Sequence, residues 1–212
     1  ETLGPVGHPK YREFLDDILG SARRLLAIIN DILEWSKLDA GHNTLELAPV
    51  SLGPLIGDLN EEVAPMFEAA GVELRTGKEP TTSAMADRGK LLLILRNLLS
   101  NAAKFTPKGG SATVSVTEPA DGWIAINVAD TGIGMREEDI PVALAPFGQV
   151  DSRLARKYEG TGLGLALVKA YVERHGGTLA ITTAPGKGTC VTVRLKAAEG
   201  DRTETPRDTI AA

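Results

Sequence analysis

Cysteine is almost absent from this sequence, since Cys190 is the only one in 212 residues and no disulfide can form within the chain. A chain without disulfides suits a reducing cytoplasm. Cys190 opens an alternating run that ends at Leu195, and we expect it at a buried strand position rather than as a reactive thiol. Positive charge is also scarce, because 28 acidic residues outnumber 23 basic ones and the net charge is -5. This balance argues against nucleic acid or an anionic membrane as a partner.

Long apolar runs are missing as well. No run approaches the roughly 20 residues that span a bilayer, and the N-terminus lacks the basic and apolar regions of a signal peptide. We therefore expect no membrane segment and a cytoplasmic location. The hydrophobic content of 42% is ordinary for a globular protein, and the length allows one large domain or one domain with an appendage.

The most regular hydrophobic pattern is a heptad seam that follows an opening loop. Its members alternate at spacings of four and three residues and are Tyr11, Leu15, Ile18, Ala22, Leu25, Ile29, Ile32 and Ser36. Leu19, Leu26 and Leu33 widen this face, which suits a four-helix bundle. The alternative is a surface helix packed on its own domain, but Gly41 ends the pattern and no second helix of comparable length precedes it. We expect this helix to need a partner.

Strands and helices intermingle beyond Gly41. The expected helices are Leu55–Ala70, Arg88–Phe105 and Gly162–His175. The expected strands are Thr44–Leu52, Val72–Thr76, Ser83–Asp87, Ser111–Thr117, Trp123–Asp130, Thr178–Thr183 and Thr189–Leu195. Helices among hairpins predict an α/β fold, namely an α/β sandwich in which helices cover one face of a mixed sheet. We expect this domain to span residues 42–197 and residues 198–212 to be a disordered polar tail.

Three polar residues share one face of the expected helix Arg88–Phe105. Asn97, Asn101 and Lys104 stand at i, i+4 and i+7, while leucines occupy the other side. An amide oxygen is a hard, neutral ligand for Mg2+ that phosphates already hold, and a lysine supplies a point charge. Taken alone, such residues are more often the solvated face of an amphipathic helix. Their interpretation therefore depends on the rest of the chain.

Two glycine-rich segments follow this helix. In the first, Asp130-Thr131-Gly132-Ile133-Gly134, the glycines let the backbone bend around a flat ligand, and the aspartate can accept a hydrogen bond from an exocyclic amine. In the second, residues 160–164, alternate glycines lead into a helix, where N–H groups and the dipole favour an anion. The first could be a common turn. The second has neither the Lys-Ser/Thr of a P-loop nor the preceding strand of a dinucleotide fingerprint.

A segment rich in turn and basic residues separates the two glycine-rich segments. It runs from Arg136 to Glu159 and contains Pro141, Pro146, Gly148, Arg153, Arg156 and Lys157. We expect a mobile lid that reaches phosphates, although charge runs are more often solvated surface. Residues 185–189, Pro-Gly-Lys-Gly-Thr, form a tight turn into the last strand and would alone indicate only a hairpin.

The order of these motifs is more specific than any one of them. An N-x-x-x-N helix, D-x-G-x-G, Pro146-Phe147-Gly148, G-x-G-x-G and G-x-G-T together resemble the N, G1, F, G2 and G3 boxes of sensor histidine kinases. These belong to the ATPase superfamily that includes gyrase, the ninety-kilodalton heat-shock chaperone and MutL. The resemblance covers roughly residues 44–197. The leading helix resembles the second helix of the kinase dimerisation hairpin, and residues 3–11 are similar to those of alphaproteobacterial cell-cycle kinases.

This resemblance implies the Bergerat ATP-binding fold behind a partial dimerisation and phosphotransfer domain at residues 1–41, with ATP and Mg2+ as cofactors. Asp130 would read the adenine amine with help from Thr189, and Asn101 would bind Mg2+ beside Asn97. The implied ATP-binding residues are Asn97, Asn101, Lys104, Phe105, Asp130, Gly132, Ile133, Gly134, Phe147, Arg156, Lys157, Gly160, Thr161, Gly162, Leu163, Gly164 and Thr189. Hydrolytic relatives carry a glutamate where Asn97 stands, and asparagine cannot act as that base, which favours phosphoryl transfer.

No histidine of this chain matches the expected phosphoacceptor, which lies inside a helix before an acidic residue. His8 precedes Pro9, His42 follows Gly41, and His175 precedes two glycines. We expect His8 and His42 in loops and His175 at a helix C-terminus, where the dipole favours it. The acceptor helix should precede Glu1, so the chain is a fragment or its parent is defective. Alone, it should not autophosphorylate.

The leading hypothesis is therefore the kinase core of a two-component sensor, which transfers the γ-phosphoryl group of ATP to a histidine that this chain lacks. A response-regulator receiver domain would then take the phosphoryl group, and the parent protein would dimerise through the leading helix. The alternative is a nucleotide-binding regulatory module or pseudokinase without phosphotransfer. A hydrolytic ATPase of the gyrase or MutL type is disfavoured by Asn97 and by the short chain.

Overall fold

The computed structural model describes residues 9–39, 44–117, 121–150 and 160–198. The chain divides into two compact units, Glu1–Asn43 and Thr44–Ala212. No helix of the described residues is long and apolar enough to cross a membrane. The predicted opening loop at residues 1–8 and most of the predicted tail, residues 199–212, lie outside the described residues.

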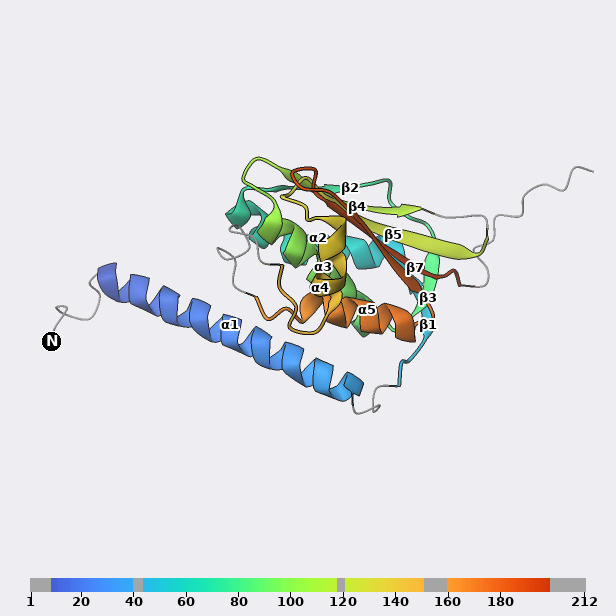
Figure 1. Ribbon diagram of the computed structural model, residues 1–212, viewed down its shortest axis with the longest axis horizontal. Coiled ribbons are helices and arrows are strands. Elements are labelled where there is room, and N and C mark those ends of the chain that lie inside the picture. Colours follow the sequence, from blue (N-terminus) through green and yellow to red (C-terminus); the bar gives the residue numbers. More distant parts are fainter. Residues whose placement is uncertain (1–8, 40–43, 118–120, 151–159, 199–212) are drawn as a thin grey trace, which may run out of the picture. The chain divides into compact units, whose positions relative to one another are not determined.

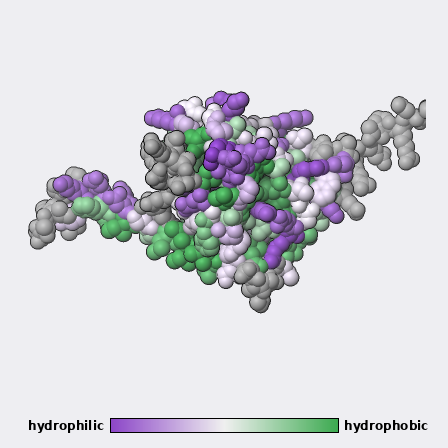
Figure 2. All heavy atoms as spheres, in the orientation of Figure 1, coloured by the Kyte–Doolittle hydropathy of each residue, from purple (hydrophilic) through white to green (hydrophobic). Residues whose placement is uncertain are grey.

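The described part of the first unit is the helix α1 (Pro9–Asp39), which confirms the predicted long helix. Figure 1 shows it without interruption. Its seam is largely exposed, with exposed fractions of 63% for Leu15, 64% for Ile18 and 58% for Leu25. In Figure 2, green apolar atoms line this helix beside purple polar ones. An apolar face of this length is typical of a helix that associates with another apolar surface.

The second unit contains the remaining elements. Its helices are α2 (Leu52–Ala70), α3 (Arg88–Phe105), the short 3-10 helix η1 (Glu137–Asp139), α4 (Ile140–Leu144) and α5 (Gly164–Arg174). Its strands are β1 (Ala48–Ser51), β2 (Glu73–Thr76), β3 (Ser83–Ala86), β4 (Ser111–Thr117), β5 (Trp123–Asp130), β6 (Thr178–Thr183) and β7 (Thr189–Lys196). The bounds of α3, β4, β5 and β6 are those that the sequence predicts.

The strands form a five-stranded mixed sheet and a separate small one. The large sheet has the order β2-β4-β5-β7-β6, in which only the β2–β4 pair is parallel, and the small sheet pairs β1 with β3 antiparallel. In the β5–β7 register Asp130 lies opposite Thr189. The topology therefore brings together two residues that the resemblance places around adenine.

Helices α2, α3 and α5 lie on one side of the large sheet, as Figure 1 shows. Alternate residues of β5 and β7 point to this side and are buried, among them Ile126 and Val193, which are fully inaccessible. The helices meet them with their own apolar stripes, including Leu95 of α3 and Leu167 of α5, both also at 0% exposure. The predicted α/β sandwich with helices on one face is confirmed.

Several predicted details differ from the structure. Helix α2 begins at Leu52 instead of Leu55, because Leu52 is buried and its N–H donates to Thr82 O at 3.1 Å. Helix α5 begins at Gly164 instead of Gly162, since Gly162 has a φ of 70° that a right-handed helix cannot include. Cys190 is half-exposed, not buried, because the buried positions of β7 begin one residue later at Val191.

Candidate nucleotide site

Helix α3 presents the predicted polar face. Asp87 caps its N-terminus by accepting a hydrogen bond from Lys90 N at 3.0 Å. The buried stripe consists largely of leucines, as predicted, and includes Leu91, Ile94, Leu95, Leu98 and Leu99. Asn97, Asn101 and Lys104 are consequently half-buried on a separate stripe of the helix.

The two asparagines of this face are held differently. Asn97 Nδ2 donates to Leu93 O at 3.0 Å, so the amide oxygen is turned away from its own helix. That oxygen lies 2.8 Å from where a Cβ on Gly164 would stand, so glycine is what allows α5 to begin so close to α3. The Asn101 side chain makes no hydrogen bond within the part of the chain that the structure describes. Its amide oxygen is available to a ligand.

Asp130, at the end of β5, has its carboxylate fixed by the backbone. Oδ1 accepts hydrogen bonds from Gly132 N at 2.7 Å and from Thr189 N at 3.2 Å. Among the described residues Oδ2 has no hydrogen-bond donor, which leaves it for a donor on a ligand. Burial raises the pKa of Asp130 above its ordinary value, although the N–H groups of Gly132 and Thr189 act in the opposite direction. The Asp130 carboxylate is therefore a hydrogen-bond acceptor that is held in a fixed orientation and partly shielded from solvent.

The first glycine-rich loop is built by close backbone contacts. A Cβ on Gly132 would lie 2.6 Å from both Asp130 Oδ1 and Phe105 O. Gly134 has a φ of 59°, and a Cβ there would collide with Ala184 O. Ile133 N donates to Phe105 O at 3.1 Å and Ile133 O accepts from Gly186 N at 2.7 Å. The loop is thus clamped between the end of α3 and the turn before β7, and side chains larger than hydrogen would disrupt it.

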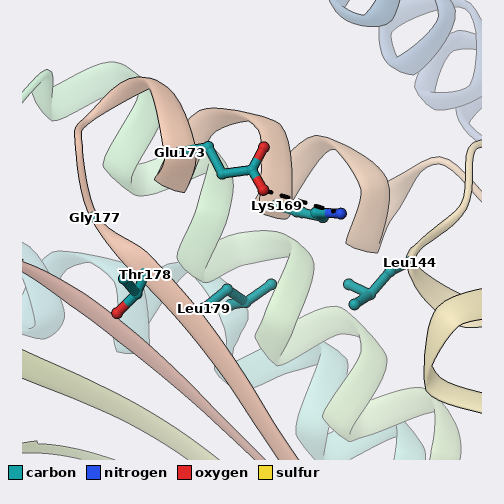
Figure 3. A pocket seen from close by; sticks show the side chains of 6 residues that line it. All are labelled: Leu144, Lys169, Glu173, Gly177, Thr178 and Leu179. Atoms are coloured by element: carbon teal, nitrogen blue, oxygen red, sulfur yellow. Dashed lines mark ion pairs between the residues drawn. The ribbon is translucent and has the colours of Figure 1, made fainter.

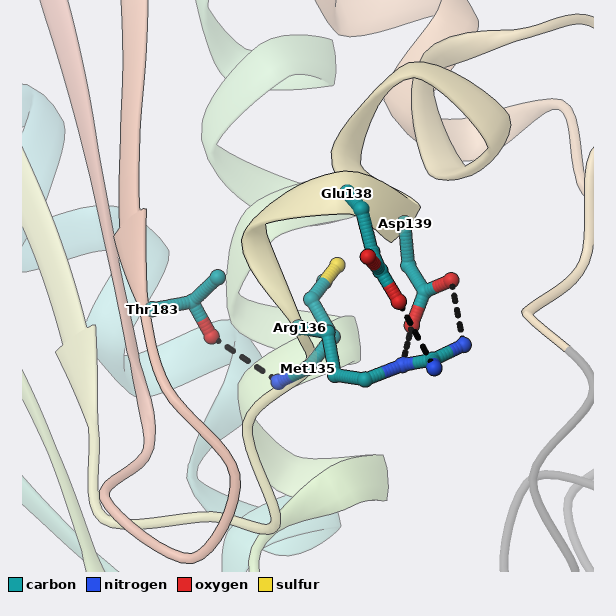
Figure 4. A network of polar contacts seen from close by, with 5 residues as sticks. All are labelled: Met135, Arg136, Glu138, Asp139 and Thr183. Carbon is teal, nitrogen blue, oxygen red and sulfur yellow. Dashed lines mark hydrogen bonds and ion pairs between the residues drawn. The ribbon is translucent and has the colours of Figure 1, made fainter.

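Thr189 takes part through two groups. Its N–H binds Asp130, and its hydroxyl lies 3.0 Å from the hydroxyl of Thr183 on β6. Thr183 Oγ1 also accepts from Met135 N at 3.0 Å, as Figure 4 shows. Figure 4 further shows Arg136 paired with Asp139 and Glu138, at 2.9 and 2.7 Å, which ties the loop to η1. Sequence reasoning missed this network, because its members come from three separate segments.

The second glycine-rich loop lies against α3. A Cβ on Gly160 would lie 2.7 Å from Lys104 Nζ, so the ammonium group stands directly beside the loop. Thr161 Oγ1 accepts from Leu163 N at 3.2 Å, and Leu163 is completely buried and anchors the loop to the core. Lys104 also stacks over the Phe105 ring, with Nζ 4.9 Å from its centroid. The structure thus brings the predicted cation to the predicted phosphate loop.

The predicted lid is only partly described. We expected no helix in this segment, but its first part contains η1 and α4. The sequence does not reveal α4, because it has only five residues and none of them is buried. Phe147 is 61% exposed and adopts a φ of 60°, while Gly148 packs against Val142 O. Arg156 and Lys157 lie outside the described residues, as do the other residues from 151 to 159. The lid thus stays a prediction for that part.

Two further features of the described residues concern metal-ligating side chains and a pocket away from the predicted nucleotide set. No group of three His, Cys, Asp or Glu side chains that could hold a metal exists within the described ranges. A pocket of about 260 Å³ lies between α4, α5 and β6, where Figure 3 shows Leu144, Leu179 and the Lys169–Glu173 pair. None of its lining residues belongs to the predicted nucleotide set.

Comparison with known sequences finds relatives that are much longer than this chain. The chain is 40% identical over 215 residues to the non-motile and phage-resistance protein of Caulobacter vibrioides, covering 100% of this chain and 25% of that protein. It is 37% identical over 202 residues to the cell-division control histidine kinase PdhS of Brucella suis, covering 91% of this chain and 20% of that kinase. The chain therefore spans a quarter or less of the length of these relatives.

Solved structures show the same fold. Full-length ShkA in complex with AMPPNP superposes with a TM-score of 0.74 at 29% identity, covering 88% of this chain and 39% of ShkA. The histidine kinase AdeS of Acinetobacter baumannii superposes with a TM-score of 0.69, covering 86% of this chain and 83% of AdeS, and at 19% identity it supports the fold alone. The resemblance to sensor histidine kinases, and to the cell-cycle kinases among them, is confirmed. A family model matches residues 86–199, and the chain belongs to the histidine kinase-, DNA gyrase B- and HSP90-like ATPases.

Proposed function

We propose that this chain is the ATP-binding kinase core of a two-component sensor histidine kinase. It binds ATP and transfers the γ-phosphoryl group to a histidine outside the chain, from which a response-regulator receiver domain takes it. One observation carries the proposal: the Asp130 carboxylate is fixed through Oδ1 by two backbone N–H groups and has Oδ2 left for a ligand. The 37% identity to the histidine kinase PdhS over 91% of this chain supports it.

Adenine fits this acceptor. An ionised carboxylate oxygen accepts from the exocyclic amine of adenine but repels the carbonyl oxygen that guanine carries at the same position. The absence of side chains at Gly132 and Gly134 lets this loop pack closely beside Asp130, which keeps the carboxylate and its backbone donors in place. Thr189 holds the carboxylate in place through its N–H, and its hydroxyl is already directed by Thr183. Specificity thus resides in one oriented oxygen atom.

The triphosphate fits the other end of the site. The N–H groups before α5 and the start of that helix favour an anion, and Lys104 adds a positive charge beside Gly160. Asn101 offers an unengaged amide oxygen of the kind that Mg2+ accepts when phosphates supply its other ligands. When bound, Mg2+ would offset phosphate charge. Phe147, Arg156 and Lys157 are proposed to close over the nucleotide.

Asn97 directs the chemistry toward transfer. Its carboxamide has no basic lone pair near neutral pH, and its Nδ2 is engaged by Leu93 O. Water beside the γ-phosphate therefore has no side-chain base at this position. Positioning and charge stabilisation supply most of the catalysis in phosphoryl transfer, so the reaction depends on an acceptor delivered in line with the phosphate.

The acceptor must come from outside the described chain. His175 is 6% exposed, and both of its ring nitrogens are within hydrogen-bond distance of backbone atoms, so it cannot reach a phosphate. His8 and His42 lie outside the described residues. The exposed seam of α1 is proposed to pair with an acceptor helix and to form the homodimer of the parent protein. Incubated alone with ATP, the chain should yield no acid-labile phosphohistidine.

The substitution Asp130→Asn tests the proposal most sharply. Asparagine can keep the two backbone bonds through Oδ1, but its NH2 group then faces the amine of adenine. Leaving two donors opposed costs on the order of 1 to 3 kcal/mol, which is about 10- to 100-fold in affinity. Calorimetry with a non-hydrolysable ATP analogue and Mg2+ measures the loss, and urea unfolding should show a retained fold.

The matched control is Asp121→Asn. Asp121 is an exposed aspartate in the turn before β5 that pairs with Arg194 at 2.9 Å, so the same chemical change is made away from the site. It should leave nucleotide affinity unchanged. Equal affinity of the wild-type chain and Asp130→Asn would refute the proposed adenine contact.

A further inference from the structure

His175 is the C-cap residue of α5, and its side chain is buried between α5 and the start of α3. The ring is buried, with Nδ1 2.7 Å from Tyr171 O and Nε2 3.1 Å from Asp87 N. A backbone N–H can only donate, so Nε2 must accept and the proton must reside on Nδ1, which then donates to the carbonyl. The imidazole therefore joins the last turn of α5 to Asp87, the residue that caps α3.

Other groups reinforce this junction. Asp87 accepts from Lys90 N at 3.0 Å and from Glu46 N at 3.2 Å, so its carboxylate is committed to the start of α3 and to the segment before β1. The Lys90 ammonium stacks over the ring of Tyr171 at 4.9 Å from its centroid, and Tyr171 is fully buried. Lys90 therefore contacts both sides of the junction, Asp87 through its backbone N–H and Tyr171 through its ammonium group.

The same two helices meet again at the candidate site. Asn97 of α3 follows the N-cap residue Asp87 by ten residues. Gly164, the first residue of α5, precedes the C-cap residue His175 by eleven residues. At about 1.5 Å per residue, the two separations are roughly 15 Å along α3 and roughly 16.5 Å along α5. The close approach of Gly164 to Asn97 and the contact of His175 with Asp87 therefore join the two ends of α5 to the middle and to the N-terminus of the antiparallel helix α3.

We propose that His175 is a positioning residue for nucleotide binding: by accepting the Asp87 N–H it fixes the axial register of α5 against α3, and so holds the glycine-rich loop over Asn97, Asn101 and Lys104. This inference rests on the proposed nucleotide site. A shift of α5 along its axis by a fraction of a turn would carry Gly160 and Gly164 away from the polar face of α3. Loss of the clamp should therefore weaken nucleotide binding although His175 touches no ligand.

Two polar substitutions separate positioning from general stability. The carboxamide oxygen of His175→Gln can reach the place of Nε2 and accept from Asp87 N, whereas His175→Asn places its amide near Nδ1 and can satisfy only Tyr171 O. Both remove the ring and should lower stability. We expect His175→Gln to bind a non-hydrolysable ATP analogue within about twofold of wild type and His175→Asn to bind about tenfold more weakly, the loss of roughly one buried hydrogen bond.

Calorimetry is done at a temperature at which circular dichroism shows each variant fully folded. Val63→Ala serves as the stability control, because Val63 is buried in α2, a helix that carries none of the proposed site residues. It should lower stability without changing affinity. Equal affinities for both His175 variants, whether unchanged or reduced, would overturn the inference, whereas a wild-type chain that binds no ATP analogue would overturn the proposed function itself.

A measurement on the wild-type chain decides the clamp even if His175→Asn does not fold. Long-range proton–nitrogen NMR correlations of the His175 ring report its tautomer directly. We expect the proton on Nδ1, and the Asp87 amide should be protected from hydrogen exchange. A proton on Nε2, or rapid exchange of the Asp87 amide in a folded chain, would show that the bond is absent and would overturn the inference.

Discussion

Helices α1 and α3 carry similar leucine-rich stripes but differ in how far those stripes are covered. In α3, Leu95 and Leu99 are completely buried beneath neighbouring elements. In α1, Leu25 and Leu26 have exposed fractions of 58% and 59%. The amphipathic pattern of a helix therefore predicts that its apolar face will be covered, but not by what. For α3 the cover lies within its own unit, and for α1 we propose a partner helix.

The largest expected effect on stability comes from replacing a leucine by alanine in α3, compared with the same replacement in α1. Leu95→Ala should destabilise the ATP-binding unit by about 2 to 5 kcal/mol, because it leaves a cavity in a closed core. Leu25→Ala should change the stability of this chain by less than about 0.5 kcal/mol, since an exposed side chain loses little burial. Urea unfolding measures both. Equal losses would mean that α1 is covered within this chain, and the comparison would fail.

A smaller loss of stability is expected when the N-cap residue of α3, Asp87, is replaced. Asp87→Ala should destabilise by about 0.5 to 2 kcal/mol, because Lys90 N and Glu46 N lose their acceptor. Partial burial acts to raise the pKa of Asp87, but the N–H groups of Lys90, Glu46 and Gly89 outweigh it, and the pKa lies below its ordinary value.

The sign of this shift sets the pH dependence of the cap. A lowered pKa in the folded state means that the carboxylate contributes stability fully above about pH 4, and loses it as the pH falls through the folded value. The difference in the free energy of unfolding between wild type and Asp87→Ala, measured by urea unfolding, should therefore become smaller below pH 4. Asp58→Ala, which removes an exposed carboxylate paired with Arg88, is the control. A gap that widens in acid would contradict the assigned role.

The smallest effects concern two helical glycines. Gly57 of α2 is exposed and a Cβ there would meet nothing within 4 Å, so Gly57→Ala should stabilise by about 0.5 to 1 kcal/mol. Gly164→Ala places a Cβ 2.8 Å from Asn97 Oδ1 and must displace that side chain. We expect it to bring no gain in stability and to weaken nucleotide binding. A similar gain at both positions, with unchanged affinity, would show that the close approach of α5 to α3 has no role.

The sequence predicted elements wherever a periodic pattern was long. Helix α3 and strands β4, β5 and β6 were placed correctly, because each combines a regular apolar period with a clear turn at its ends. The order of the glycine motifs also predicted which segments meet around Asp130 and Lys104. What the sequence could not show were contacts between distant positions. Asp87 and His175 are 88 residues apart, and the short α4 has no buried stripe to reveal it.

The account depends most directly on adenine recognition by Asp130. Calorimetry of the wild-type chain with Mg2+ and non-hydrolysable analogues of ATP and GTP, side by side, tests it without any substitution. We expect ATP to bind about 10- to 100-fold more tightly, because guanine would place a carbonyl oxygen against Oδ2 and leave two acceptors opposed. Equal affinities for the two analogues would contradict the assignment of Asp130 as the adenine contact and, with it, the proposed site.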